Sequence, residues 1–295
     1  MAIIGIAFLF VLGLFAGGWL SRIAYRLPRE IPLFHKPNFC TECGYRLAIA
    51  ESIPLFSWIR LGKRCAHCME PIPFRYPVLE LVTAILWALE GWRLTTLRGL
   101  GTSALIGIMA VELLFLSMMV VVVLVDWEFL VIPDEISLGG TIAGLASASI
   151  LPVPLGGGFP DGEFDGWGNL LHSFAGAIGG IAVMLVLYYA GKALFKSQIR
   201  NAQAQDPEID SVLGLGDVKL MGCFGAFLGF EALFPLFLIA VFSGSVAGIY
   251  LKLSSGEPGD AKGFAALRNR WRNGDSFFPF GPFLALGAII MLYLR

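Results

Sequence analysis

The sequence has little charge for its length. Charged residues make up 15% of the 295 positions, hydrophobic residues make up 57%, and the mean hydropathy is +0.75. A soluble domain of this size would carry far more charge, so these values indicate a protein with several membrane helices. The first apolar stretch, residues 2–20, also lacks preceding basic residues and a small-residue cleavage site. We therefore interpret it as a retained helix rather than a signal peptide.

Long apolar runs recur along the whole chain. A helix needs about 20 apolar residues to cross a hydrocarbon core of about 30 Å. By this measure, spans are expected at residues 2–20, 78–92, 103–125, 136–151, 169–191 and 277–294. Residues 218–253 hold two shorter spans, with the turn near Glu231 and Pro235. The sequence therefore predicts an all-α polytopic membrane protein with about eight transmembrane helices.

The expected outer loops have few basic residues. If the N-terminus lies outside, 18 of the 21 Lys and Arg residues fall on the inner side, and only Arg93, Arg98 and Arg295 fall on the outer side. The expected outer loop 152–168 has none. Because cytoplasmic loops carry an excess of Lys and Arg, we predict a multi-pass protein with its N-terminus outside.

Cysteine is also scarce, and four of the five cysteines form two Cys-x2-Cys pairs with 21 residues between them: Cys40, Cys43, Cys65 and Cys68. Two such pairs supply the tetrahedral set of thiolates that zinc accepts, although iron can occupy the same set. A cytoplasmic location disfavours disulfides. We predict a structural zinc site, with His67 as a loop residue and Cys223 as a packing residue.

These observations divide the chain into three parts. Residues 1–20 form the first transmembrane helix, and residues 78–295 form the main membrane domain. The cysteine pairs belong to residues 21–77, which we predict to be a small cytoplasmic zinc-ribbon-like module inserted after the first helix. A segment this small has too small a hydrophobic core to fold stably alone. The metal is therefore expected to contribute to the free energy of folding.

Three aspartates lie near the ends of predicted spans. Asp134 follows Pro133 and precedes an apolar run, so we expect it to start and cap the next helix. Asp217 opens a run in "GLGDVKL", where a helix cap and a functional carboxylate both remain open. Asp126 ends a helix, where the helix dipole disfavours an anion, so capping does not explain it. Intramembrane acids are functional candidates, and we predict a functional role for Asp126.

Two carboxyl groups at one membrane face suggest a specific chemistry. Like charges in contact cannot both ionise cheaply, so the pair holds one proton. The ionised member takes a proton from water while the other donates to a substrate carbonyl, as in aspartyl peptide hydrolysis. The main alternative is a proton- or cation-coupled transporter, which also uses intramembrane acids. A metal-containing scaffold without catalysis is a third interpretation.

Several motifs in the same order resemble the bacterial type IV prepilin leader peptidases, membrane aspartyl proteases of the Gly-x-Gly-Asp class. They are "YRLP" after the first helix, the two cysteine pairs, "DWEFLVIPD" and "GLGDVKL". The resemblance implies that Asp126 and Asp217 are the catalytic pair. It also implies a bacterial inner-membrane enzyme that cuts the leader of type IV prepilins and pseudopilins after a glycine, at the cytoplasmic face. Signal-peptide-peptidase-like proteases share Gly-x-Gly-Asp but are not expected to carry the cysteine module.

The resemblance further implies N-methylation of the new N-terminus with S-adenosylmethionine, as in many family members. The residues themselves assign no methyl-donor site, since the glycines at 17, 18, 179 and 180 are equally well helix-packing residues. The expected partners are prepilin substrates and the lipid bilayer, with no nucleic acid.

Three further charged residues lie in or near the predicted spans. Glu80 and Glu112 each need a partner there, and Glu80 is expected to join a polar network between the module and the membrane. Lys219 either tunes the charge of Asp217 or extends toward the membrane surface.

Overall fold

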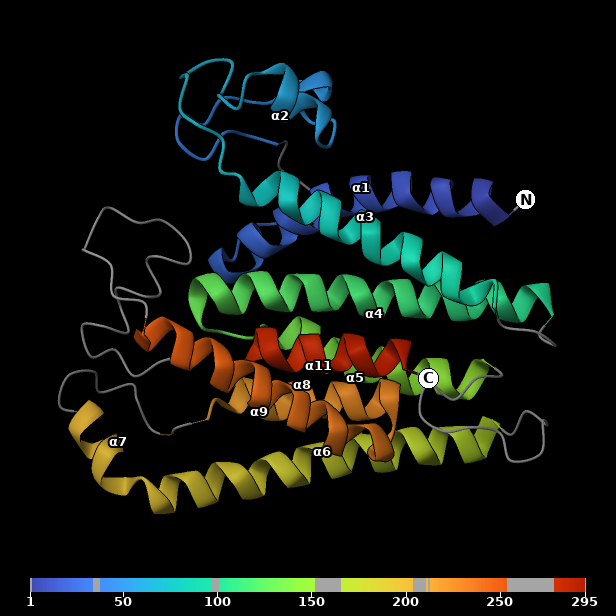
Figure 1. The fold of residues 1–295 in the computed structure, drawn as a ribbon, viewed down its shortest axis with the longest axis vertical. Helices are drawn as coiled ribbons and strands as arrows, with labels where there is room; N and C mark the ends of the chain where they lie inside the picture. The colour runs from blue at the N-terminus through green and yellow to red at the C-terminus, as the bar shows by residue number, and fades with distance from the viewer. Residues whose placement is uncertain are drawn as a thin grey trace. The chain divides into compact units, whose positions relative to one another are not determined.

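The computed structural model describes residues 2–33, 38–96, 101–151, 166–203, 211, 213–253 and 279–294, and these are helical apart from turns, loops and two isolated β-bridges. Eight of the helices have 13 residues or more. They are α1 (Ala2–Arg26), α3 (Arg75–Leu94), α4 (Thr102–Phe129), α5 (Asp134–Ile150), α6 (Gly166–Leu194), α8 (Leu215–Leu228), α9 (Phe230–Leu253) and α11 (Gly281–Tyr293) (Figure 1). Each overlaps one of the predicted spans, so the all-α prediction is confirmed for the described residues.

Within the described part of the chain, four helices are long and apolar enough to cross a membrane by length and composition. They cover Ile3–Arg29, Thr102–Phe129, Gly166–Leu194 and Phe230–Tyr250. Gly281–Tyr293 is apolar but shorter. The structure therefore shows a helical protein with four candidate membrane spans, and the count of eight stays a prediction.

The expected turn at Glu231 and Pro235 is wrong. The break between α8 and α9 falls at Gly229, whose φ of 72° lies in the region that favours glycine. Pro235 lies inside α9. There it removes the hydrogen bond that a residue with an amide hydrogen would donate to the Glu231 carbonyl, without ending the helix.

Two other boundaries differ from the predictions. The first helix continues to Arg26, past the expected end at residue 20. The last begins at Gly281 rather than residue 277, with Phe280 as its N-cap and a proline in its first turn. Most of the expected outer loop, residues 152–165, lies outside the described residues, and the remainder belongs to α6.

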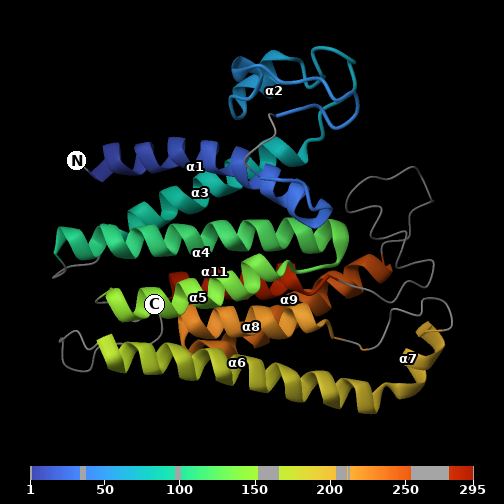
Figure 2. The ribbon, with the colours of Figure 1, turned by 180° about the vertical axis from the view of Figure 1, so that it is seen from behind.

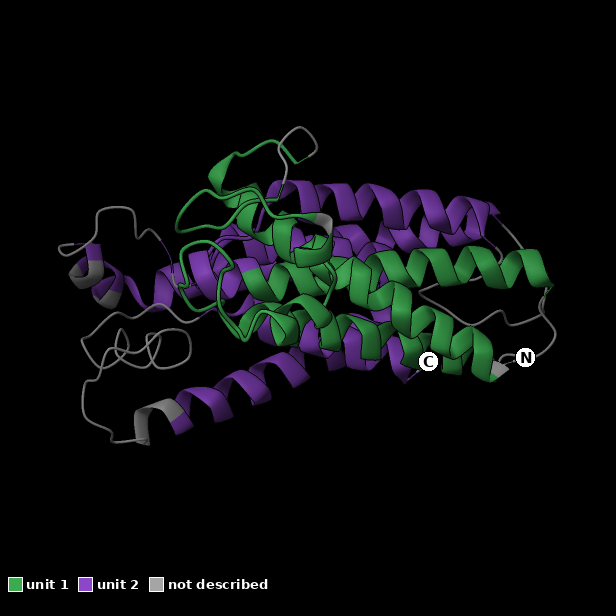
Figure 3. Ribbon diagram, turned by 90° about the horizontal axis from the view of Figure 1, so that it is seen from above, with its two compact units in different colours: residues 1–124 green, residues 125–295 purple. Residues whose placement is uncertain are grey.

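The chain forms two compact units, Met1–Leu124 and Val125–Arg295 (Figure 3). In the first unit α1 packs along α3. Glycines make this close approach possible, since a Cβ on Gly13 would come 2.6 Å from the Ala84 Cα, and a Cβ on Gly17 would come 2.6 Å from the Glu80 Cα. Gly17 is therefore a helix-packing residue.

In its described residues, the segment between α1 and α3 holds three short helical pieces. These are η1 (Leu27–Arg29), η2 (Ile49–Glu51) and α2 (Phe56–Arg60). The two β-bridges, Phe39 with Arg46 and Arg64 with Pro71, flank the cysteine pairs. The segment therefore has little regular structure of its own.

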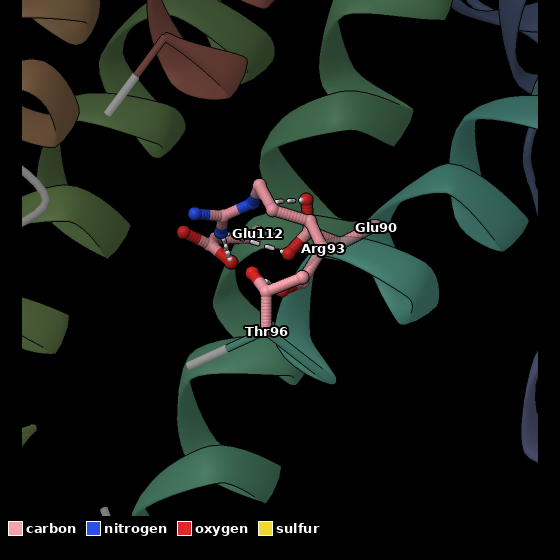
Figure 4. Close-up of polar contacts among 4 residues, drawn as sticks. All are labelled: Glu90, Arg93, Thr96 and Glu112. Carbon is pink, nitrogen blue, oxygen red and sulfur yellow. Dashed lines mark hydrogen bonds and ion pairs between the residues drawn. The ribbon is translucent and has the colours of Figure 1, made fainter. Parts of the chain in front are cut away.

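A charged cluster joins α3 to α4 inside the first unit (Figure 4). The Arg93 guanidinium donates to Glu90 Oε1 at 2.9 Å and also pairs with Glu112. Both glutamates are almost fully buried, whereas the Arg93 side chain is 15% exposed. The partner that Glu112 was expected to need is therefore Arg93.

In the second unit α8 packs against α5, α6, α9 and α11 (Figure 2). Small residues allow the contact with α6, because a Cβ on Gly176 would overlap the Gly225 carbonyl oxygen. The Ser173 hydroxyl also donates to the Ala226 carbonyl at 2.5 Å. α6 is followed by the short helix α7 (Lys196–Gln203). These contacts make α8 the buried central element of its unit.

Candidate functional site

Asp126 lies in the last turn of α4, and its side chain is buried. The helix ends just beyond it, where Leu130 adopts a left-handed conformation and its amide donates to the Asp126 carbonyl at 3.0 Å. The carboxylate accepts a hydrogen bond from the Gly281 amide, with 2.9 Å between the nitrogen and Oδ2. Asp126 therefore does not cap its own helix. This agrees with its position at the C-terminal end of the helix, which capping does not explain.

Asp217 lies in the first turn of α8 and is also buried. Gly214 rather than Asp217 is the N-cap residue, with an extended backbone. A Cβ on Gly216 would come 3.1 Å from the Ile132 Cβ. This glycine therefore lets the start of α8 approach the segment that follows Asp126.

The second unit thus brings Asp126 and Asp217 together from positions 91 residues apart in sequence. They lie close enough for the charge of Asp126 to act on the Asp217 carboxyl. Two buried carboxyls in this relation can share a proton, the property that aspartyl hydrolysis requires.

An ion pair lies beside these two aspartates. The Lys219 ammonium donates to both carboxylate oxygens of Asp134, at 2.6 and 2.9 Å. Asp134 begins α5 as expected, but Pro133 is the N-cap residue, so the predicted capping role is wrong. Neither prediction for Lys219, tuning of the Asp217 charge or extension toward the membrane surface, included this ion pair, and both stay predictions. The fold places α5 against α8, which gives each charge a partner that the sequence did not reveal.

The two cysteine pairs lie in turns with similar backbone hydrogen bonds. The Cys40 amide donates to the Tyr45 carbonyl at 2.8 Å, and the Cys65 amide donates to the Glu70 carbonyl at 2.9 Å. The backbone amides of Cys68 and His67 lower the pKa of the Cys65 thiol to about 7. This favours the thiolate form that binds metals.

The turns bring all four cysteines together, with every Sγ within 4.8 Å of the others. Thiolates about 2.3 Å from one tetrahedral ion lie about 3.8 Å apart, so this set fits a single metal ion. The ring of His67 stacks on Tyr45, with 5.0 Å between the centroids and 6° between the planes. His67 is therefore a loop residue, as predicted, and Cys223 is buried in α8.

Comparisons with known proteins show the family of this chain. Residues 11–94 match the model of the bacterial peptidase A24 N-terminal domain, and residues 113–249 match that of the type IV leader peptidase family. A prepilin leader peptidase/N-methyltransferase of Aeromonas salmonicida is 30% identical over 86% of this chain and 69% of its own length. The chain belongs to the type IV leader peptidase family.

Other relatives with the same name extend this similarity. The protein of Myxococcus xanthus is 32% identical over 85% of this chain, and the match spans 64% of that relative's length. The protein of Aeromonas hydrophila is 28% identical over 96% of this chain and 88% of its own length. No solved structure matches the chain.

Glu80 connects the cysteine segment of this leader peptidase family member to its first two long helices. The Leu55 amide donates to Glu80 Oε2 at 2.7 Å, so the expected polar contact between the cysteine segment and α3 is present. A Cβ on Gly18 would come 3.2 Å from Glu80 Oε1. A Cβ on Gly180 would overlap the Met221 carbonyl oxygen. Both glycines are thus accounted for by helix packing.

The sequence reasoning missed Gly281. This residue stands in "PFGPFLA", where a Gly-Pro pair just before an apolar run is a signal of a helix start. That signal could have placed the start of α11. It could not have shown that the Gly281 amide reaches a carboxylate 155 residues away.

Proposed function

We propose that this protein is a membrane aspartyl endopeptidase that uses Asp126 and Asp217 as its catalytic pair. The observation that carries the proposal is the meeting of two buried carboxyls, from α4 and α8, within one compact unit. Membership of a peptidase family supports the same chemistry. The transporter alternative finds no support in the family or in the names of the relatives.

The carboxyl pair performs hydrolysis with a single shared proton. The ionised carboxylate removes a proton from a water molecule, which then attacks the carbonyl carbon of the scissile peptide bond. The protonated carboxyl donates its proton to the carbonyl oxygen, and the resulting diol breaks down to an acid and an amine. No covalent enzyme intermediate forms. This chemistry requires no metal, so the cysteine site has a structural role.

The proposed substrates are type IV prepilins and pseudopilins, in accordance with the names of the relatives. The substrate's hydrophobic helix would lie in the bilayer among the enzyme's helices, with its leader at the membrane boundary. The bilayer itself would then orient the scissile bond. In this proposal the enzyme spans the bacterial inner membrane eight times, with its N-terminus outside and its active site at the cytoplasmic face.

The proposed metal is zinc, held by Cys40, Cys43, Cys65 and Cys68. Four thiolates without an open coordination position are typical of structural zinc sites. In this role the metal would stabilise a segment with little regular structure.

The names of the relatives also suggest N-methylation of the new N-terminus, with S-adenosylmethionine as the methyl donor. The glycines considered for such a site serve helix packing in the described residues. We therefore assign no residue to the methyl donor and derive no step through it.

The test is cleavage of a purified prepilin by the purified, lipid-reconstituted protein. Asp126→Asn and Asp217→Asn are each expected to lower kcat by at least about 1,000-fold, since each removes one member of a pair that acts as a unit. Mass spectrometry of the product's N-terminus reports the cleavage site and any added methyl group together.

Glu231→Gln is the matched control, because Glu231 is an exposed acid in the first turn of α9. This variant should cleave like the wild type. Cleavage that survives in both aspartate variants would exclude the proposed mechanism.

A further inference from the structure

The catalytic pair has a third structural neighbour, the beginning of α11. The Gly281 amide donates to Asp126 Oδ2 across 2.9 Å, and this hydrogen bond is buried. A hydrogen bond to a carboxylate is short and strong. It therefore restricts the orientation of the carboxylate that accepts it. One oxygen of Asp126, Oδ2, is therefore held by the backbone.

The backbone amides of the first turn of α11 explain why Gly281 makes this contact. The first amides of a helix have no partner within the helix. Here the amides of Phe283 and Leu284 both donate to the Phe280 carbonyl at 3.1 Å, and Pro282 has no amide hydrogen. Gly281 therefore supplies the amide of this turn that is directed at Asp126.

The same contact leaves no room for a side chain at position 281. A Cβ there would come 2.8 Å from Asp126 Oδ2, 3.1 Å from Cγ and 3.3 Å from Cβ. Real Cβ atoms are essentially never as close as 2.8 Å to another heavy atom, so any other residue would displace the carboxylate or the helix. A glycine at this position lets the amide and the carboxylate lie at hydrogen-bonding distance without such a displacement.

The position of the Gly281 amide is in turn fixed by packing of α11. Gly287 lies against α9, where an added Cβ would come 2.6 Å from the Leu236 carbonyl oxygen. The rings of Phe280 and Phe237 meet edge to face, with their centroids 6.2 Å apart. Leu284 is fully buried on the same helix. The Gly281 amide therefore belongs to a well-packed helix rather than to a loosely packed loop.

We propose that Gly281 is a positioning residue that holds the Asp126 carboxylate in its catalytic orientation through its backbone amide. The proposal rests on the proposed function, because it assigns Gly281 a role in the same reaction. Displacement of a reacting group by about 1 Å can cost about 100-fold in rate. Since the proposed role of Gly281 acts through Asp126, its loss should lower kcat and leave KM near the wild-type value.

A double-mutant cycle tests the contact without using activity. Gly281→Ala should lower the thermal unfolding midpoint of the purified protein, and Asp126→Ala should remove most of that loss because it deletes the atoms that the new methyl group meets. Gly13→Ala is the matched control, since its Cβ would meet the Ala84 backbone at 2.6 Å in the other unit. Its effect on the midpoint should be the same with and without Asp126.

Kinetics test the positioning role. In prepilin cleavage, Gly281→Ala should lower kcat about 10- to 100-fold with little change in KM. Gly13→Ala should keep the wild-type kcat for the folded protein. A Gly281→Ala enzyme with wild-type kcat, or equal stability losses with and without Asp126, would overturn the proposal. Full activity of Asp126→Asn would instead overturn the proposed function, so the two failures are distinguishable.

Discussion

The acidic residues of the described helices have different kinds of neighbours, and the neighbour decides what each acid can do. Glu112 pairs with the guanidinium of Arg93, and Glu80 accepts a hydrogen bond from the Leu55 amide. Asp126 accepts a hydrogen bond from the Gly281 amide, and its charge acts on a second buried carboxyl, that of Asp217. A buried acid paired with a cation is suited to holding helices together, whereas two buried carboxyls that interact are suited to proton transfer.

The cluster around Arg93 gives a prediction at this scale. Arg93→Met would leave Glu90 and Glu112 buried without their cation, which typically costs about 3–5 kcal/mol. The thermal unfolding midpoint of the purified protein should therefore fall clearly. Arg60→Met, which removes an exposed cation on α2, should change the midpoint little. Equal midpoints for the two variants would show that the cation at position 93 does not stabilise the helices.

The helix α8 both carries Asp217, a proposed catalytic residue, and packs against neighbours on several sides. From Val218 to Leu228 almost every residue is buried, and α5, α6, α9 and α11 all contact this helix. Glycines on α6 and α8 bring the two backbones together, since without large side chains between them the axes can approach closely. The position of Asp217 therefore depends on the fit of α8 between its neighbours.

Gly176→Ala tests this dependence. The new methyl group would overlap the Gly225 carbonyl oxygen, so we expect a loss of about 1–3 kcal/mol in the free energy of unfolding, with reduced prepilin cleavage. The control is Gly139→Ala on α5, where a Cβ has nothing within 4 Å. That variant should be neutral or stabilised by up to about 1 kcal/mol, because alanine favours the helix. Thermal unfolding and cleavage rates check both, and a neutral Gly176→Ala would contradict close packing.

The two compact units of the molecule differ in the interactions that stabilise them. Unit 2, Val125–Arg295, contains long helices with extensive buried contacts, among them those of α8. The cysteine segment of unit 1 has only short helical pieces and two β-bridges in its described residues. Stability is therefore expected to be uneven along the chain, with the cysteine segment dependent on its metal.

Removal of the metal should affect the cysteine segment alone. Cys43→Ser is expected to lose most of the roughly one equivalent of zinc that four thiolates hold, and to expose residues 38–74 to protease. The helical circular dichroism should remain near that of the wild type. The control is Cys223→Ser, which changes the buried cysteine of α8 and should keep the metal. Elemental analysis is the measurement, and full zinc occupancy in Cys43→Ser would contradict the assignment.

The sequence by itself determined the helical class, the approximate place of the long helices and the candidate functional residues. Apolar runs of sufficient length specify membrane helices because the bilayer leaves backbone groups no other partner. The spacing of Cys40, Cys43, Cys65 and Cys68 predicts a metal site because the ligands of each pair are local. Asp126 stood out for a similar reason, since the end of its own helix is an unfavourable place for an anion.

Only the tertiary structure decided which distant groups meet. Nothing local in the sequence connects Lys219 with Asp134, Arg93 with Glu112, or the Gly281 amide with Asp126. Those contacts depend on how helices pack, and packing is set by the shapes of many side chains and glycines at once. For that reason residue type and position were sufficient to single out Asp126, and the family resemblance was needed to pair it with Asp217, while the packing of α4, α8 and α11 decided what surrounds them.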